Sequence, residues 1–361
     1  MATRKSTVTI HDVARKAGVS AATVSRVLNN SNLVVAETGK RIRKIARELN
    51  YIPSASARSL SIRKTEAIGL LLPDMYGDFF SEIIRGADLA ARGQNYHLIV
   101  SSSHSNTIEL DAAVKTLSGR VDGMIIMSPH LESSTHLTSL LQAMPVVIIG
   151  STLILENADH INIDNEGGAK QVVEYLLRQG HRDIAIIRGE ENNQDADERL
   201  SGFRKALAEN EIVLPDRFVA TGNFTEQSGF DAASSLLDGP VRPTAIFCSN
   251  DSMAIGAISA IRQRGLRIPD DVSVCGFDDI PVAQFLSPSL TSVHVPIHEL
   301  GLTAVYRLFE RLASAPTWKP AQISVRSTLS IRNSCLKLNR MSNQSKEGNV
   351  TFSRSADAPA K

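Results

Sequence analysis

The sequence predicts a small all-α helix-turn-helix head, followed by an α/β body of two doubly wound parallel-sheet subdomains. The first 50 residues form three short segments with helical spacing of apolar residues. From Thr65 onward, short apolar runs alternate with helical segments, which is typical of parallel sheets covered by helices on both faces. The charge changes at the same place: residues 1–64 carry 13 Lys and Arg and three acids, a net +10, and the remainder carries 26 bases and 35 acids, a net −9. A basic end on an acidic body indicates a nucleic-acid-binding head on a separate domain.

The first helix of the head begins at Thr9. Its apolar face comprises Ile10, Val13, Ala14 and Ala17. Thr9 is a suitable N-cap, and Asp12 three residues later comes close to a capping box. Gly18 ends the helix, because glycine adopts the left-handed C-cap conformation at little cost.

The second helix follows at once, with Ser20 as its cap. Val24, Val27 and Leu28 face inward, which leaves the outward positions Ala21, Ala22, Ser25, Arg26 and Asn29. Two short helices joined by a glycine turn match the helix-turn-helix motif. The alternative is an ordinary helical hairpin with a solvated face.

A basic third helix, Ala36–Asn50, completes the head at residues 1–52. Residues 53–64 are a short Ala/Ser-rich stretch that begins with Pro53, and we expect a hinge helix there. A helix this short is marginal alone, because nucleation is costly, so it should form only with a partner. A plain linker is the alternative.

The body contains about ten predicted strands, which would make an unusually wide single sheet. The strands are Ile68–Leu72, Tyr96–Ser101, Gly123–Met127, Val146–Ile149, Ile161–Ile163, Asp183–Ile187, Arg217–Thr221, Ala245–Cys248, Val272–Phe277 and Thr328–Arg332. We therefore predict two lobes, residues 65–162 with 291–322 and residues 163–290 with 323–335. A ligand should bind between them at the carboxyl ends of the strands. Residues 336–361 are Ser/Asn/Lys/Ala-rich and are expected to be a disordered tail.

Other features exclude several classes of protein. No run approaches about 18 consecutive apolar residues, and no apolar region follows Arg4 and Lys5, so neither a membrane span nor a signal peptide is predicted. Cys248, Cys275 and Cys335 lie far apart without metal-ligand spacing, which favours reduced thiols in a cytoplasmic protein. We expect no metal site, no cofactor and no catalytic residues.

Taken together, these pieces resemble the LacI (lactose-repressor) family of bacterial transcription regulators from about residue 8 to residue 335. The motifs that carry the resemblance are the head Thr9–Asn30, the hinge Asn50–Leu60, and Ala67–Pro73, Gly180–Ala185, Glu198–Phe203, Ser249–Asp251, Pro269–Asp279 and Leu329–Arg332 in the body. Their order and spacing are specific for the family but not for one member. The family's body has the fold of periplasmic binding proteins.

The resemblance implies roles for the head and the hinge. Ala21, Ala22 and Arg26 match base-contacting positions, and Arg26 can form two hydrogen bonds to guanine; one more phosphate contact is the alternative. The other expected DNA contacts are Thr9, Ser20, Thr23, Ser25 and Asn29. Leu60, with Ala57 and Arg58 beside it, matches the hinge leucine that wedges between base steps in the minor groove; packing on its own head is the alternative.

The resemblance also implies a site for a small-molecule effector. Its candidate residues are Phe79, Phe80, Ser128, Asp195, Arg199, Phe224, Asn250 and Asp278. Phe80 could instead belong to the core, and Asn250 or Asp278 could simply cap a turn. Gly150-Ser151 stands where many members carry larger polar residues, so no member's ligand is transferred.

The resulting hypothesis is a DNA-binding repressor, working as a homodimer on a pseudo-palindromic operator and controlled by a sugar or sugar derivative. Two alternatives remain at this stage. A solute-binding protein shares the two-lobed body, although the basic head argues against it. An enzyme of sugar or nucleotide metabolism is possible on such a fold, but the sequence has no Gly-x-Gly-x-x-Gly, P-loop or Gly-x-Ser-x-Gly fingerprint.

Overall fold

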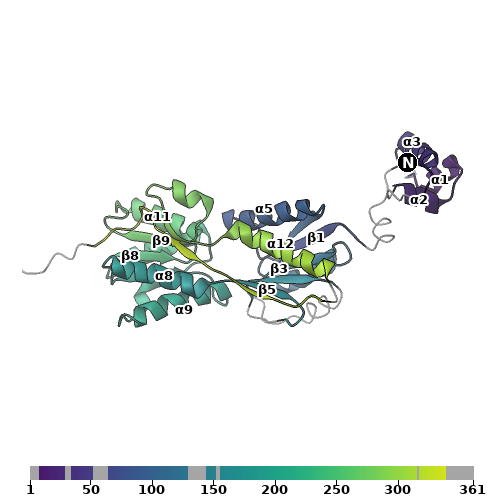
Figure 1. Cartoon of the computed structure of the whole chain (residues 1–361). Coiled ribbons are helices and arrows are strands. Elements are labelled where there is room, and N and C mark those ends of the chain that lie inside the picture. The colour runs from purple at the N-terminus through teal and green to yellow at the C-terminus, as the bar shows by residue number, and fades with distance from the viewer. Residues whose placement is uncertain are drawn as a thin grey trace, which may run out of the picture. The chain divides into compact units, whose positions relative to one another are not determined.

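The head is a bundle of three short helices in the computed structural model, which describes residues 8–28, 34–51, 64–128, 144–151, 155–314 and 317–338. The helices are α1 (Ile10–Ala17), α2 (Ala21–Leu28) and α3 (Ala36–Glu48) (Figure 1). Their shared core consists of Val13, Ala14, Ala17, Val24, Val27, Ile42 and Ala46. These are the helical-spacing positions of the three segments, so the local pattern is enough to build this bundle.

The three predicted helix boundaries of the motif, at Thr9, Gly18 and Ser20, are confirmed. Asp12 Oδ2 accepts hydrogen bonds from Thr9 N at 3.0 Å and from Thr9 Oγ1 at 2.7 Å, which ties the start of α1 to its first turn. Gly18 has φ +63°, in the left-handed region that suits glycine. Ser20 Oγ accepts from Thr23 N at 3.2 Å and caps α2.

The chain divides into two compact units, the first of which includes the head. The first comprises Met1–Asn162 with Ile297–Ser324, and the second comprises Ile163–Pro296 with Val325–Lys361. The chain therefore passes between the units three times. Two six-stranded sheets result, one in each unit, as the doubly wound prediction requires.

The first sheet has the strand order β11-β5-β4-β3-β1-β2. Its strands are β1 (Ala67–Leu72), β2 (His97–Ser102), β3 (Gly123–Met127), β4 (Val146–Ile149), β5 (Asp159–Ile163) and β11 (Gln322–Val325). Every residue of β1, β3 and β4 is buried, as expected for parallel strands covered on both faces. The helices of this unit are α5 (Asp78–Gly93), α6 (Thr107–Leu117) and α12 (Ile297–Ala313).

Helices α5 and α12 pack directly against each other, although more than 200 residues separate them in the chain (Figure 1). A side chain at Gly86 would place its Cβ 2.1 Å from the carbonyl oxygen of His298, and one at Gly301 would lie 2.3 Å from that of Ile83. Glycine is therefore required where the two backbones approach. Through this contact, α12 joins the first unit, although it comes late in the chain.

The second sheet has the order β12-β10-β9-β8-β6-β7. Its strands are β6 (Ile184–Arg188), β7 (Val219–Thr221), β8 (Ala245–Cys248), β9 (Ser273–Asp278), β10 (Thr291–His294) and β12 (Thr328–Ser330). Its helices are α8 (Asn165–Arg178), α9 (Gln194–Ala208), α10 (Glu226–Leu237) and α11 (Asp251–Gln263), with short 3-10 turns at Asp216–Phe218 and Pro281–Phe285. A Cβ at Gly276 would meet Asp251 of α11, and the ring of the next residue, Phe277, lies against Gly168 of α8. Because successive strand residues face opposite sides, helices cover both faces of this sheet.

The structure corrects the predicted lobe boundaries. We predicted residues 291–322 in the first lobe, but β10 pairs in parallel with β9, so 291–296 belong to the second unit. Conversely, β11 lies in the first sheet, and residues 323 and 324 belong to the first unit rather than to the second lobe. Strand β12 runs antiparallel to β10, which departs from the all-parallel expectation. Short strands of Thr, Ser and Gln carry little local signal, so their partners decide where they lie.

The end of the described chain packs on the second unit. Leu338 N donates to the carbonyl oxygen of Gln179 at 2.8 Å, and His181 Nε2 lies 3.0 Å from the carbonyl oxygen of Leu336. The predicted disordered tail therefore does not begin at residue 336, and residues 339–361 lie outside the described chain. Among the described helices, none has the length and hydrophobicity needed to cross a membrane.

Candidate functional site

Helix α2 presents a small outer face, which carries predicted DNA contacts. Ala22 and Arg26 are exposed, and Ser25 is half-buried. Ala21, predicted to face outward, is half-buried and packs against the core of the head, because its Cβ lies on the side of α2 that meets the bundle. Arg26 and Ala22 therefore remain as the most accessible candidates for base contacts.

The other expected DNA contacts differ in whether their side chains already form hydrogen bonds within the head. The hydroxyl of Thr9 is exposed but donates to Asp12, and those of Ser20 and Thr23 share a hydrogen bond of 2.8 Å. These groups first stabilise the helix starts. Four predicted contacts lie outside the described residues: Asn29, Ala57, Arg58 and Leu60.

The basic face of α3 is partly structural. Arg43 Nη1 donates to the carbonyl oxygen of Val27 at 3.3 Å, at the carboxyl end of α2, where cations are favourable. Lys16 of α1 pairs with Glu48 at 3.1 Å. The exposed bases Lys40, Arg41, Lys44 and Arg47 are the remaining positive charges of α3.

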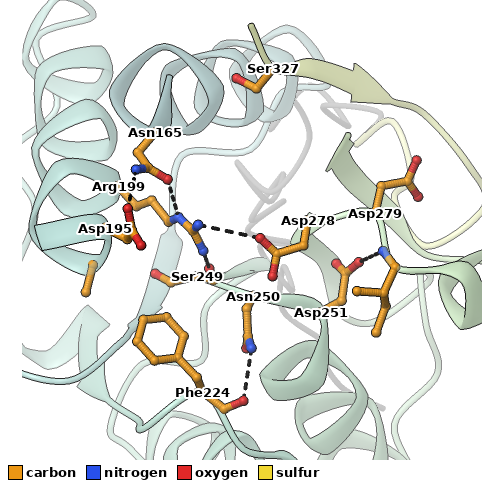
Figure 2. Close-up of polar contacts among 12 residues, drawn as sticks. Asn165, Asp195, Arg199, Phe224, Ser249, Asn250, Asp251, Asp278, Asp279 and Ser327 are labelled. Atoms are coloured by element: carbon orange, nitrogen blue, oxygen red, sulfur yellow. Dashed lines mark hydrogen bonds and ion pairs between the residues drawn. The ribbon is translucent and has the colours of Figure 1, made fainter. Parts of the chain in front are cut away.

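A polar cluster surrounds Arg199 at the carboxyl ends of β8 and β9 in the second unit. We call it the Arg199 cluster; its members are Asn165, Asp195, Arg199, Phe224, Asn250 and Asp278 (Figure 2). Arg199 is 3% exposed, and its guanidinium lies 3.8 Å from the ring centroid of Phe277. It donates through Nε to Asn165 Oδ1 at 2.8 Å and through Nη1 to the carbonyl oxygen of Ser249. Its Nη2 lies 3.5 Å from Asp278 Oδ1. These contacts hold the cation in one orientation.

Asn165 is the member of the cluster that sequence reasoning missed. It is the first residue of α8 and is 1% exposed. Its Oδ1 accepts a hydrogen bond from Arg199, and its Nδ2 donates to Asp195 Oδ1 at 2.8 Å (Figure 2). The same Nδ2 also donates to Glu198 Oε2 at 3.0 Å. An amide can do both because it carries an acceptor and two donors. The available signal was its place at the start of a helix, two residues after the end of the buried strand β5.

Asp278 ends β9 and is buried close to Arg199. Burial raises its pKa to about 7; Arg199 opposes this rise and Asp195 adds to it. Its Oδ1 is buried and accepts no hydrogen bond from the residues that the structure describes. It therefore offers an acceptor that a ligand hydroxyl could use.

The turn that carries Asp278 is backed by a second buried acid. Asp278 and Asp279 have φ of +101° and +55°. Asp251 accepts from Ile280 N at 2.8 Å and from Ser292 Oγ at 2.6 Å, and burial raises its pKa well above the ordinary value. These bonds hold the left-handed turn, so Asp251 positions Asp278 from behind (Figure 2).

Asn250 and Phe224 form the other side of the cluster. Asn250 Oδ1 accepts from Met253 N at 2.9 Å and caps α11, which is the alternative role considered above. Its Nδ2 donates to the carbonyl oxygen of Phe224 at 2.9 Å. The ring of Phe224 packs against Gly189, directly after β6. A Cβ atom at residue 189 would lie 2.1 Å from Cζ of Phe224, so only glycine leaves room for the ring.

The remaining candidates lie in the first unit. Phe79 and Phe80 open α5, where their rings meet edge to face with centroids 5.4 Å apart, and both are half-buried. Ser128 is 8% exposed directly after β3, and Ser151 is 3% exposed after β4. Of these four residues, Phe79, Phe80 and Ser128 are predicted effector contacts, and Ser151 is not. The structure thus brings five of the eight predicted effector residues together in the second unit, and three lie in the first.

Comparison with known proteins agrees with this architecture. Residues 9–54 match the family described as "Bacterial regulatory proteins, lacI family", and residues 173–335 match a "Periplasmic binding protein-like domain". The HTH-type transcriptional repressor PurR of Pasteurella multocida (strain Pm70) is 37% identical over 328 residues, 90% of this chain and 98% of that protein. The ribose operon repressor of Haemophilus influenzae is 37% identical over 305 residues, 84% of this chain and 92% of that protein.

Solved structures give the same result. The Lac repressor dimer bound to operator and the anti-inducer ONPF has a TM-score of 0.79 and 31% identity, covering 91% of this chain and 99% of its own. The transcriptional regulator CelR in complex with cellobiose has a TM-score of 0.68 and 30% identity over the same shares. The resemblance seen in the sequence is thereby confirmed, and both alternatives, a solute-binding protein and an enzyme, are set aside. The chain belongs to the lacI family of bacterial regulatory proteins, which are DNA-binding transcriptional regulators and not enzymes.

Proposed function

We propose that this protein is a repressor whose affinity for its operator is controlled by an uncharged carbohydrate bound at the Arg199 cluster. The observation that carries the proposal is the buried pair of Arg199 and Asp278, whose Oδ1 accepts no hydrogen bond from the described residues. A guanidinium that donates beside a carboxylate that accepts complements a pair of neighbouring hydroxyls, because each hydroxyl both donates and accepts. The Phe224 ring supplies an apolar surface for the C–H face of a sugar ring.

The charges around Arg199 favour an uncharged ligand. Asp195, Glu198 and Asp278 carry three carboxyl groups against one guanidinium, and Asn165 joins two of them to Arg199. A phosphorylated sugar would be repelled by these acids. The related ribose operon repressor and the cellobiose complex of CelR support a carbohydrate.

On the DNA side, Arg26 and Ala22 of α2 would read base edges while α3 lies near phosphates. The protein would bind as a homodimer, with two heads on a pseudo-palindromic operator, as the Lac repressor dimer does on its operator. The hinge residues Ala57, Arg58 and Leu60 would add minor-groove contacts. Because a repressor acts on chromosomal DNA, the protein would function in the cytoplasm.

The ligand can regulate DNA binding only if it binds the two conformations of the protein unequally. Phe79, Phe80 and Ser128 stay predicted ligand contacts that lie in the first unit. A ligand that favours the DNA-binding conformation would be a corepressor, and one that favours the other would be an inducer. Operator affinity measured with and without ligand gives the sign directly.

The test is a thermal-shift screen of full-length protein with pentoses, hexoses, disaccharides, sugar phosphates and nucleobases. A ligand at about 100 times its Kd should raise the melting temperature by about 5 °C or more. The Asp278→Asn variant, which keeps the side-chain shape, should weaken the binding of the active ligand at least about tenfold by losing the charged acceptor. The matched control is Lys205→Ala on the exposed side of the same helix as Arg199, which should bind normally. A response to nucleobases alone, or to sugar phosphates in preference to free sugars, would overturn the carbohydrate assignment.

A further inference from the structure

Two cysteines that are 60 residues apart in the chain meet in the second unit, with their Sγ atoms 3.2 Å apart. Cys275 lies in the middle of β9, and Cys335 lies in the segment that follows β12. We propose that Cys275 and Cys335 are an oxidation site, which a hydroperoxide converts into a disulfide that fastens the C-terminal segment to β9. This site is independent of the effector cluster and of its ligand.

Backbone and hydroxyl contacts already hold the two residues in place. Ser334 Oγ accepts from Thr291 N at 2.8 Å and donates to the carbonyl oxygen of Val274 at 2.6 Å, and the Ser334 carbonyl oxygen accepts from Val274 N at 2.9 Å. The segment is thus bound to β9 immediately before Cys275. A disulfide has an S–S distance of about 2.05 Å, so the two sulfur atoms must approach by roughly 1 Å to form the bond.

The two thiols differ in their surroundings. Cys275 is fully buried, and burial raises its pKa well above the ordinary value. Cys335 is half-buried, and the hydrogen bond with Cys275 is the largest cause that lowers its pKa. Cys335 is therefore the thiol that a small oxidant reaches first and the one with more thiolate character.

The chemistry needs one equivalent of hydroperoxide. In the first step the Cys335 sulfur attacks the peroxide and becomes a sulfenic acid, while the O–O bond breaks and one molecule of water or alcohol leaves. In the second step the Cys275 sulfur attacks the Cys335 sulfur, the S–O bond breaks, and hydroxide leaves with the Cys275 proton as water. Two thiols are oxidised and one peroxide is reduced, so the electrons balance.

The chain also provides an internal control in Cys248 of β8. It is fully buried, and burial raises the pKa of its thiol. It should therefore stay reduced under conditions that oxidise the Cys275–Cys335 pair.

The experiment treats the full-length protein with a small excess of hydrogen peroxide. The expected result is a mass loss of two hydrogen atoms per chain, a cross-linked peptide containing Cys275 and Cys335, and complete reversal by dithiothreitol. Because the bond closes a loop of 60 residues, the melting temperature of the oxidised protein should rise by about 5 °C or more.

Variants make the outcome specific. Cys248→Ala should behave as the original protein, whereas Cys335→Ser should show neither the cross-link nor the rise in melting temperature. Cys275→Ala should leave Cys335 to gain oxygen atoms instead. The proposal is overturned if the original protein gains oxygen at Cys335 without a cross-link, if it does not react, or if Cys335 links two chains.

Discussion

Asp278 is a buried carboxyl group, and the effect of its raised pKa on stability can be measured. Burial raises its pKa to about 7 in the folded protein, above the ordinary value of 3.8. The folded state therefore holds a proton that the unfolded state has lost between about pH 4 and pH 7. The contribution of this group to stability is thus greatest at low pH and falls as the pH rises through that window.

We predict that Asp278→Asn removes this contribution, since an amide does not titrate. The melting temperature of the variant relative to the original protein should increase by at least about 3 °C between pH 4.5 and pH 7.5. Thermal unfolding at several pH values, without ligand, provides the measurement. A constant difference between the two proteins would show that Asp278 is ionised throughout.

At the same scale, the resemblance gave Arg199 and Asp278 as candidates for one effector site, and their side chains lie 3.5 Å apart. It did not give Asn165, which joins Arg199 to two acids. The only local signal of Asn165 is its place at a helix start shortly after a buried strand, which is common for asparagine. Its role depends on Asp195 and Glu198, which lie at least 30 residues later.

Helix α2 carries the residues that are predicted to contact bases. We predict that Arg26→Ala weakens binding to a selected operator by about 1–3 kcal/mol and relaxes the preference at one base position, because its two hydrogen bonds to guanine are lost. The measurement is binding to operators selected from random DNA, followed by binding to all single-base changes.

The control for this prediction is Arg41→Ala on the exposed face of α3. It should weaken binding to all sequences alike and reduce the slope of log affinity against log salt by about one. If Arg26→Ala behaves in the same way, Arg26 contacts phosphate and the direct-readout assignment is wrong.

The helices and strands also show where a local sequence pattern is sufficient to predict an element. Helix α12, Ile297–Ala313, is a 17-residue amphipathic helix, so its own apolar spacing carries the signal for it. Strands β10 and β11 were missed, because four residues rich in Ser, Thr and Gln do not show an apolar run. Their register with β9 and the first sheet, not their composition, makes them strands.

At the scale of the whole molecule, the chain crosses between the units three times, so the end of the chain completes the second sheet. Ser334 forms hydrogen bonds with Val274 and Thr291, and the carbonyl oxygen of Leu336 lies within hydrogen-bond distance of His181 Nε2. We predict that a chain ending at Arg332 melts about 5 °C or more below the full-length protein, since buried backbone groups of β9 and β10 lose their partners. Differential scanning calorimetry measures this directly.

The matched control is a chain ending at Leu338, which keeps all of these bonds and should melt with the full-length protein. Equal melting temperatures for the two truncated chains would contradict the role assigned to the Ser334 contacts.

The sequence by itself determined the three-helix head, the alternating body and the family, because these rest on helical spacing, caps and motifs that lie within short stretches. Only the tertiary structure decided which unit β10 and β11 join, that Ala21 is half-buried, and that Asn165 links Arg199 to two acids. It alone brought Cys275 and Cys335 together. The physical reason is the same in each case: these features arise from contacts between residues distant in the chain, which no local pattern encodes.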